Sequence, residues 1–353
     1  MIRISIITSL LLIMTNCDRE TSEQTVCDPQ LINRGSTLSA LTLSLPSEVV
    51  TGLMKEPTSE GALGRNKEGY FHVRFQMDIV SLAAFAIKYQ NQQALEKLVL
   101  AMEYSFRYQL TPGDFELVVP PSLQSMPPAT EGDKCSGVAF FASALGSSLM
   151  MLKQSEWYNN LPSNSLKDRL NLLTEKFSKT LHYLIANKLL LQSYDRDAPN
   201  RLLFDALAFY SLGTYLGDAS AIQTGVDFIE RALQKQDAEG FLKEGDGFDS
   251  SYNGVSLKLG LMLLGIVSNS DPIYNKLQLA MSCCAQWQAN RVKSSGEIST
   301  EGNSRVYSGG ETFLGEEKQV AWVDTLLSFY YVYHLSNRAS YLTLASDITN
   351  YYR

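Results

Sequence analysis

The chain has 353 residues, of which 45% are hydrophobic and 19% charged, so it carries enough apolar material for a large folded core. Its formal net charge is −7. Because nucleic-acid binding needs a basic face, this charge argues against DNA or RNA as a partner.

The N-terminus has the pattern of an export signal. Arg3 precedes an apolar run at 4–14, which is too short to span a bilayer but suits the core of a signal peptide. The run leads to Cys17, and the segment resembles a bacterial lipoprotein signal in which Cys17 carries the lipid, although Asn16 stands where a small residue is usual. A plain signal peptide or a membrane-anchored N-terminus are the alternatives. Residues 18–34 are predicted to form a flexible tether.

Four further cysteines follow: Cys27, Cys135, Cys283 and Cys284. Export would permit disulfides. Cys283 and Cys284 are neighbours in a helical pattern, and we expect both to behave as small apolar residues. The chain has three His and no cysteine spacing typical of zinc, so we predict no metal site and no cofactor, with Ca²⁺ in the acidic loops left open.

From residue 35 onward the sequence repeats one unit: a helix that is apolar nearly all round, a short turn, a more amphipathic helix and a long loop. An extra helix is predicted within 35–55. The five predicted pairs are 75–90 with 93–109, 136–153 with 165–189, 200–216 with 219–236, 254–268 with 273–293, and 320–336 with 339–352.

Helices that are apolar nearly all round must be buried on most faces, whereas their partners keep one solvated face. An all-α fold satisfies both demands: an α/α toroid, or incomplete barrel, of about five to six helix pairs with the apolar helices inside. A superhelical solenoid is the competing architecture. We expect a single domain over 35–353.

The long loops are predicted to gather at one end of this ring, because the helices of each pair run antiparallel. They are 61–74, 110–135, 190–199, 237–253 and 294–319, and loops of such length are usually functional. Similar runs that begin at Gly113, Gly240 and Gly296 predict short β-hairpins along this rim.

Residues 243–254 carry the densest set of polar groups and lead into the apolar helix at 254–268. The candidates here are Asp246, Asp249, Tyr252 and Asn253. Helix N-terminal amides at this point also favour negative charge. Ordinary capping of the helix is the competing interpretation.

Two other groups of polar residues belong to the same end of the ring. The last long loop carries Arg305, Tyr307 and Glu311 beside a Gly-Gly pair that would let a ligand approach the backbone. The entries of the first and third apolar helices add four candidate binding residues: His72, Arg74, Asn200 and Arg201.

The helix-pair pattern, together with Gly247-Phe248-Asp249-Ser250-Ser251-Tyr252, resembles carbohydrate-active proteins of the α/α-toroid class. That class includes polysaccharide lyases of the alginate-lyase and heparinase types, uronyl epimerases and inverting glycosidases. The resemblance is architectural and covers most of the mature chain, and no His accompanies Ser251 and Tyr252 as it does in the alginate-lyase type. It implies an enzyme that acts on a poly- or oligosaccharide in a cleft at the long-loop end.

The resemblance leaves two chemistries open. In β-elimination, Tyr252 would act as base or acid beside a uronate carboxyl, which His72, Asn253 or Arg305 would neutralise. In inverting hydrolysis, Asp246 or Asp249 would face Glu311 across about 6.5–9.5 Å.

Charge separates these chemistries only in part. Asp and Glu outnumber Lys and Arg in the long loops, which favours a neutral sugar unless Ca²⁺ or a local basic pocket intervenes. A non-catalytic glycan- or protein-binding lipoprotein is the alternative function. In either case we predict a monomer in the bacterial cell envelope, anchored to the membrane by its lipid and facing the periplasm or the exterior.

Overall fold

The computed structural model describes residues 27–123, 128–162, 165–313 and 315–353. The predicted signal, Cys17 and residues 18–26 of the predicted tether lie outside the described residues. The helices are α1 (Leu38–Ser44), α2 (Ser47–Leu53), α3 (Ile79–Tyr89), α4 (Gln92–Arg107), α5 (Glu131–Lys153), α6 (Glu156–Asn160), α7 (Ser165–Leu172), α8 (Thr174–Ala186), α9 (Lys188–Tyr194), α10 (Pro199–Leu216), α11 (Ala219–Leu233), α12 (Ser250–Leu264), α13 (Pro272–Asn290), α14 (Trp322–Ser336) and α15 (Ala339–Tyr352), with short 3₁₀ turns at η1 (Val73–Gln76) and η2 (Pro121–Leu123).

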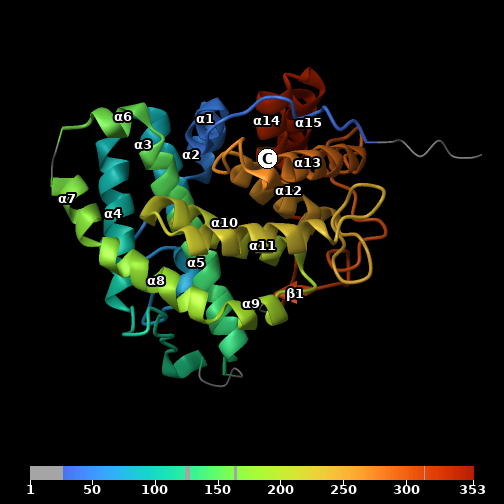
Figure 1. Ribbon diagram of the computed structural model, residues 1–353. Helices are drawn as coiled ribbons and strands as arrows, with labels where there is room; N and C mark the ends of the chain where they lie inside the picture. Colours follow the sequence, from blue (N-terminus) through green and yellow to red (C-terminus); the bar gives the residue numbers. More distant parts are fainter. Residues whose placement is uncertain (1–26, 124–127, 163–164, 314) are drawn as a thin grey trace, which may run out of the picture.

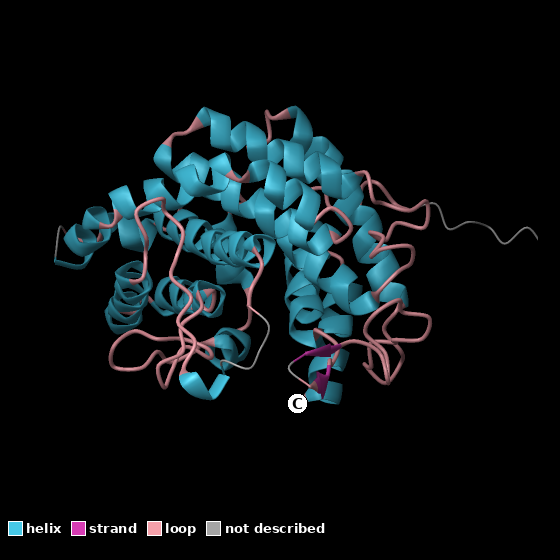
Figure 2. Ribbon diagram, turned by 90° about the horizontal axis from the view of Figure 1, so that it is seen from below, coloured by secondary structure: helices cyan, strands magenta, loops and turns pink. Residues whose placement is uncertain are grey.

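The helices form an incomplete ring with an inner and an outer layer (Figures 1 and 2). The apolar helices α3, α5, α10, α12 and α14 form the inner layer, and α4, α8, α11, α13 and α15 pack on their outer sides. Helix α1 contacts α3, α5, α12 and α14, and α2 contacts α3. This arrangement confirms the predicted all-α toroid.

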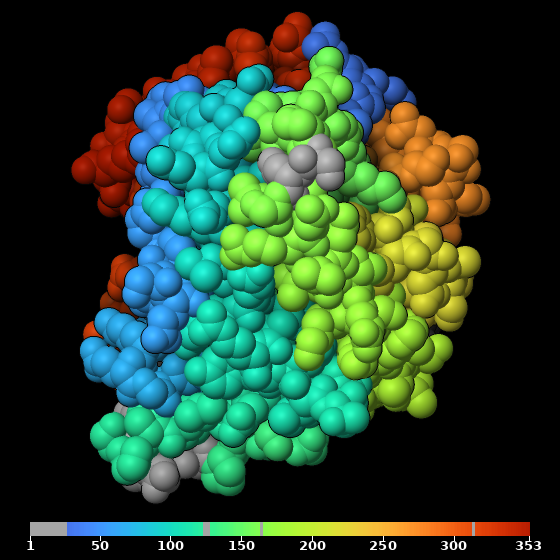
Figure 3. All heavy atoms as spheres, turned by 90° about the vertical axis from the view of Figure 1, so that its left-hand side faces the viewer, coloured from blue at the N-terminus to red at the C-terminus, as the bar shows by residue number. Residues whose placement is uncertain are grey.

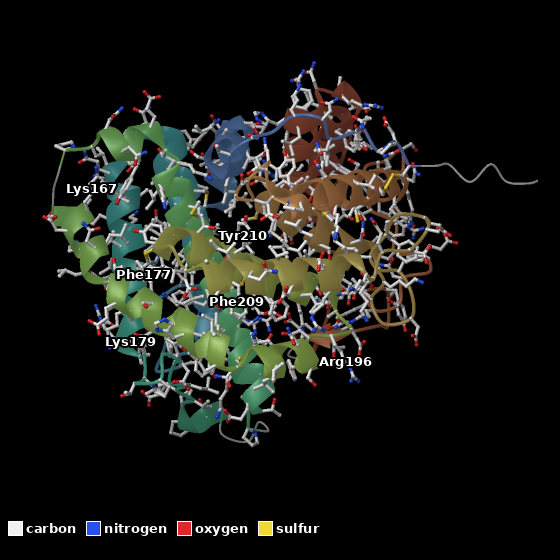
Figure 4. The ribbon with its side chains drawn as sticks, in the orientation of Figure 1. Lys167, Phe177, Lys179, Arg196, Phe209 and Tyr210 are labelled. Carbon is white, nitrogen blue, oxygen red and sulfur yellow. A yellow bond between two sulfur atoms is a disulfide. The ribbon has the colours of Figure 1, made fainter. Side chains whose placement is uncertain are left out.

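Burial explains which helices lie inside. Helix α5 is long and apolar enough to cross a membrane by length and composition, but its apolar window is entirely buried in the domain. Helix α11 instead has one buried face, and its Phe228 stacks on Phe209 of α10 at a ring separation of 5.4 Å. Figure 4 labels Phe209 and Tyr210 on α10 and Phe177 on α8, and Figure 3 shows α4, α7 and α8 covering one outer face.

Three long loops open with the same tight turn, and the glycine in it is required. Gly113, Gly240 and Gly296 all have positive φ. A single β-bridge joins the residues on either side of each turn: Gln109–Phe115, Gln236–Leu242 and Val292–Ile298. A Cβ on Gly296 would lie 2.0 Å from the backbone oxygen of Asp347 in α15, so the turn presses directly on an outer helix. The loop ends are thereby fixed to the ring.

The loops themselves contain little regular sheet. One antiparallel ladder, β1 (Thr312–Phe313) with β2 (Glu316–Glu317), lies in the last loop, and the other pairings in the described loops are single bridges. The predicted loop 190–199 is shorter than expected, because α9 continues to Tyr194. The predicted helix 165–189 is divided among α7, α8 and α9.

The N-terminal segment requires two corrections. Residues 27–34 are not a tether: Leu31 and Ile32 are about 1% exposed, and the amides of Asn33 and Arg34 donate to the Leu335 carbonyl. Cys283 is not merely a small apolar residue either, because it forms a disulfide with Cys27, 256 residues away. Its neighbour Cys284 is free and buried as expected, as is Cys135. Residues 27–34 thus belong to the packed domain.

Candidate functional site

The first turn of α12 places Tyr252 at the long-loop end of the ring. Asp249 is the N-cap of this helix, and its Oδ1 accepts hydrogen bonds from the amides of Ser251 and Tyr252. Its Oδ2 accepts from the amides of Arg305 and Val306, at 3.0 and 2.7 Å. One carboxylate therefore joins the start of α12 to the last long loop and brings Arg305 beside Tyr252.

These contacts give two of the predicted site residues a positioning role. Asp249 is 0% exposed, and both its oxygens are occupied by backbone amides, so it does not face Glu311 as a catalytic acid. Asn253 is also 0% exposed: its Oδ1 accepts from the Leu242 amide and its Nδ2 donates to Gln288. The capping interpretation therefore describes Asp249, whereas Asn253 joins α12 to the loop before it and to α13.

The hydroxyl of Tyr252 is surrounded by charged groups. It donates to Glu311 Oε2 at 2.6 Å, and Lys318 Nζ donates to the same hydroxyl. The guanidinium of Arg305 lies 4.3 Å from the centre of the Tyr252 ring, and its Nη2 donates to Glu311 Oε1 at 3.1 Å. We call Tyr252, Glu311, Arg305, Lys318 and Glu244 the Tyr252 cluster.

Glu244 is the buried member of the cluster. Its Oε2 accepts from Arg305 Nη1 at 2.9 Å, while its Oε1 is buried and has no hydrogen-bond partner among the described residues. Burial raises the pKa of Glu244 to about 7, and the neighbouring Arg305 offsets this only in part. Glu244 is thus poised to hold or release a proton near neutral pH.

Glu311 is shifted the other way. Burial alone would raise its pKa, but the hydrogen bond from Tyr252 and the charges of Lys318 and Arg305 outweigh burial and hold the pKa below its ordinary value. The pKa of Tyr252 is raised by burial and by donation to Glu311. The two carboxyls that bind the Arg305 guanidinium therefore have pKa values shifted in opposite directions, which is typical of an acid–base pair.

Three further candidate residues come from the start of η1 and the first turn of α10: His72, Arg74 and Arg201. Arg74 lies over the Phe140 ring at 4.1 Å, and no residue in the described ranges forms an ion pair with it. His72 Nδ1 accepts from the Arg74 amide, and burial, followed by the charge of Arg74, lowers its pKa to about 4, so it is neutral. Arg201 donates to the buried Asp195 at 3.1 Å.

Basic and acidic side chains lie together at the site, where Arg305 pairs with Glu244 and Glu311, Lys318 with Glu311, and Arg201 with Asp195. The pKa of Arg74 is lowered by burial and by Arg201, and the pKa of Lys318 is lowered by burial and by Arg305 and Arg74. Arg305 and Lys318 contact the Tyr252 ring, and Arg74 is close enough to interact with Tyr252 and with Arg201.

The remaining predicted residues are more peripheral. Asp246 is exposed in the turn between Glu244 and Gly247, and Tyr307 is 45% exposed. Asn200 is buried, with its Oδ1 lacking a hydrogen-bond partner among described residues. Nowhere in the described part of the chain do three or more His, Cys, Asp or Glu side chains form a group that could hold a metal ion.

Sequence reasoning missed Glu244 and Lys318. Glu244 lies in the same acidic loop as Asp246 and Asp249, but no local sequence pattern indicates that it is the acid that contacts Arg305. Lys318 follows the β1–β2 turn, which folds it back onto Glu311: the Lys318 amide donates to the Glu311 carbonyl at 2.9 Å. Only that hairpin register brings its ammonium to Tyr252.

Comparisons with known proteins address the fold. No protein-family model and no curated protein sequence matches the chain. A sugar epimerase from a ruminal bacterium is similar in structure, with a TM-score of 0.53, 13% identity, and coverage of 88% of this chain and 85% of that one. D-mannose isomerase gives a TM-score of 0.50 at 10% identity, covering 88% and 86%. The fold is the α/α toroid of these sugar-acting proteins.

A third similar structure is an unsaturated glucuronyl hydrolase from Streptococcus agalactiae, with a TM-score of 0.39, 9% identity and coverage of 90% and 97%. Its TM-score is too low to support an argument. At such identities, similarity establishes the shared fold and says nothing about the reaction.

Proposed function

We propose that the protein is a carbohydrate-active enzyme that cleaves an anionic, uronate-containing poly- or oligosaccharide by β-elimination. The supporting observation is the Tyr252 hydroxyl, held between Glu311 and Lys318 beneath the Arg305 guanidinium. A uronate brings a negative charge, and Arg74, which interacts with Tyr252 and has no ion pair among the described residues, would compensate it.

Each side chain then has a chemical task. Glu311, which is ionised, accepts the proton from the carbon beside the uronate carboxyl, and Tyr252, whose raised pKa keeps it protonated, donates its proton to the leaving sugar oxygen. The electrons form the new carbon–carbon double bond, and the bond to the leaving sugar oxygen breaks, so no water is consumed. Lys318 and Arg305 stabilise the phenolate and the charge that develops on the carboxyl.

Arg74 is suited to bind the uronate carboxylate. It lacks an ion-pair partner among the described residues, and its guanidinium lies over the Phe140 ring. An unpaired, partly buried cation costs desolvation energy that an anionic substrate would recover. We therefore assign Arg74 to substrate carboxylate binding, with neutral His72 positioning it.

Inverting hydrolysis is the second candidate, favoured by one observation. Glu244, with a pKa near 7, and Glu311, with a lowered pKa, form an acid and a base on two sides of Arg305. In that reaction Glu244 protonates the leaving oxygen and Glu311 activates water. Glu244 takes the place that the sequence suggested for Asp246 or Asp249.

The two reactions give different products. We would incubate the purified protein with a panel of polyuronates and neutral polysaccharides, and follow ultraviolet absorbance together with reducing-end release. Both signals rise in elimination, and only reducing ends rise in hydrolysis. Binding of a glycan with neither signal would instead indicate the non-catalytic alternative.

Variants test the role of Tyr252. Tyr252→Phe should reduce turnover roughly 10²–10⁴-fold with little change in melting temperature, because it removes one acid–base group. Tyr307→Phe, a change of the same type at an exposed tyrosine of the last loop, is the matched control. Asp249→Asn should lower the melting temperature as well as activity, since Asp249 holds four backbone amides. Full activity of Tyr252→Phe would contradict the proposal.

We also propose that the chain is exported and lipid-anchored at Cys17 in the bacterial cell envelope, as a monomer facing the periplasm or exterior. The apolar run at 4–14 supports export, and the Cys27–Cys283 disulfide suits an oxidising compartment. Radiolabelled fatty acid should enter the wild-type protein and not Cys17→Ser. Equal labelling of both would contradict the anchor.

A further inference from the structure

A cavity of about 370 Å³ lies among the inner helices, apart from the Tyr252 cluster. Its walls come from α1, α2, α3, α5, α10, α12 and α14, and they include Met151, Leu207, Leu259 and Met262. Folded proteins contain few voids larger than a water molecule, and an apolar cavity of about 150 Å³ is already enough to bind benzene. A cavity more than twice that volume is large enough for a ligand of its own.

The hydroxyl groups in the wall are almost all occupied, and the wall also contains two carboxyls, Asp78 and Asp324. The hydroxyls of Thr42, Ser81 and Ser143 each donate to a backbone carbonyl of their own helix or turn. Ser147 is 0% exposed, and its hydroxyl has no hydrogen-bond partner within the described residues. A sugar needs many hydrogen bonds from its site, so this interior suits an aliphatic chain with few polar atoms.

The mouth of the cavity has a different character. Val80, Ala84 and Leu327 are half-buried there, between α3 and α14. Lys258 is paired with Asp324, which also lines the cavity. Lys55 lines the same mouth, is exposed, and forms no ion pair with any described residue. Asp78 also lines the cavity, where burial raises its pKa and the charges of Lys55 and Lys258 offset this in part. The mouth therefore offers Lys55 to a polar head group, with one acidic side chain near it.

We propose that this cavity binds a single aliphatic chain, with the tail among the inner helices and a polar or anionic head beside Lys55. The proposal does not depend on the proposed function, because no member of the Tyr252 cluster lines the cavity. Loss of one would leave the other standing.

Decanol and decanoate are suitable probes, below their aggregation limits, with binding measured by titration calorimetry and melting temperature. Both should bind the wild-type protein and raise its melting temperature, since a ligand of the native state stabilises it. Ala84→Trp places a large side chain at the mouth and should weaken both at least tenfold. Ala289→Trp, at a half-buried alanine on outer helix α13, is the control and should bind both normally.

Two more variants keep the test decisive. Lys55→Gln should weaken decanoate and leave decanol unchanged, and equal effects would overturn the placement of the head. If Ala84→Trp does not fold, Ala144→Leu fills the cavity from α5 and should weaken both probes while keeping the fold. Absence of binding to the wild-type protein, or unchanged binding by the folded filling variant, would overturn the proposal.

Discussion

Glu244 offers the sharpest test of the electrostatics at the site. Burial raises the pKa of its carboxyl from an ordinary value of 4.5 to about 7, despite the ion pair with Arg305. A carboxyl whose pKa rises on folding is one whose ionised form is less favourable in the native state. Its destabilising effect is absent below pH 4.5, grows as the pH rises towards 7, and is complete above that.

The magnitude follows from the shift. The pKa rises by about 2.5 units, and each unit corresponds to about 1.4 kcal/mol, so the full effect is roughly 3 kcal/mol. Most of this is developed between pH 5 and pH 8. Glu244→Gln cannot ionise, and its free energy of unfolding should therefore gain on that of the wild-type protein by about 2.5 kcal/mol over this interval.

Urea denaturation at pH 5, 6, 7 and 8 measures this difference directly. Glu239→Gln, at an exposed glutamate in the same loop, is the control and should follow the wild-type curve at every pH. The informative quantity is the change with pH in the difference between the two free energies of unfolding, because loss of the Arg305 ion pair adds the same amount to that difference at every pH. If the difference in unfolding free energy between the Glu244→Gln variant and the wild-type protein does not change from pH 5 to pH 8, then Glu244 is ionised throughout. That result would refute Glu244 as the general acid of hydrolysis.

Two further predictions concern stability. Gly296→Ala should lower the free energy of unfolding by roughly 1–3 kcal/mol, because the residue has a φ of +89° and the new Cβ would lie 2.0 Å from the Asp347 oxygen. Gly309→Ala is the control and should cost less, since its φ is +81° but nothing lies within 4 Å of the new Cβ. Equal losses of stability in guanidinium denaturation would contradict the close approach at Gly296. Cys27→Ser should lower the free energy of unfolding by roughly 2–5 kcal/mol, since it opens a loop of 256 residues. Reductant should have the same effect on the wild-type protein and none on the variant, and a wild-type protein indifferent to reductant would show that the disulfide is absent.

The ring could be predicted from the sequence because its signal is local. Helix α10 is predicted at 200–216 and observed at Pro199–Leu216, and α15 is predicted at 339–352 and observed at Ala339–Tyr352. Apolar periodicity and turn residues within each segment are sufficient for such assignments. The break of 165–189 into three helices was missed, since nothing in its periodicity differs from that of one continuous helix.

Only part of the candidate site could be predicted from the sequence, because several of its contacts are not local. Tyr252 and Glu311 could be found because each lies in a segment dense with polar groups. The Cys27–Cys283 disulfide and the Lys318 contact could not, because they join residues 256 and 66 positions apart. Such pairings depend on how the whole ring closes, and no local pattern reports them.

The loop before α12 separates two tasks that its composition does not distinguish. Asp249 and Glu244 are both buried acids five positions apart, and both contact Arg305. Asp249 accepts hydrogen bonds from backbone amides through both oxygens, and these bonds hold α12 and the last loop together. Glu244 accepts from the Arg305 side chain through one oxygen and keeps the other without a partner. Proton transfer requires a carboxyl oxygen that backbone amides do not already occupy, and for that reason Glu244, rather than Asp249, suits the acid of the proposed hydrolytic alternative.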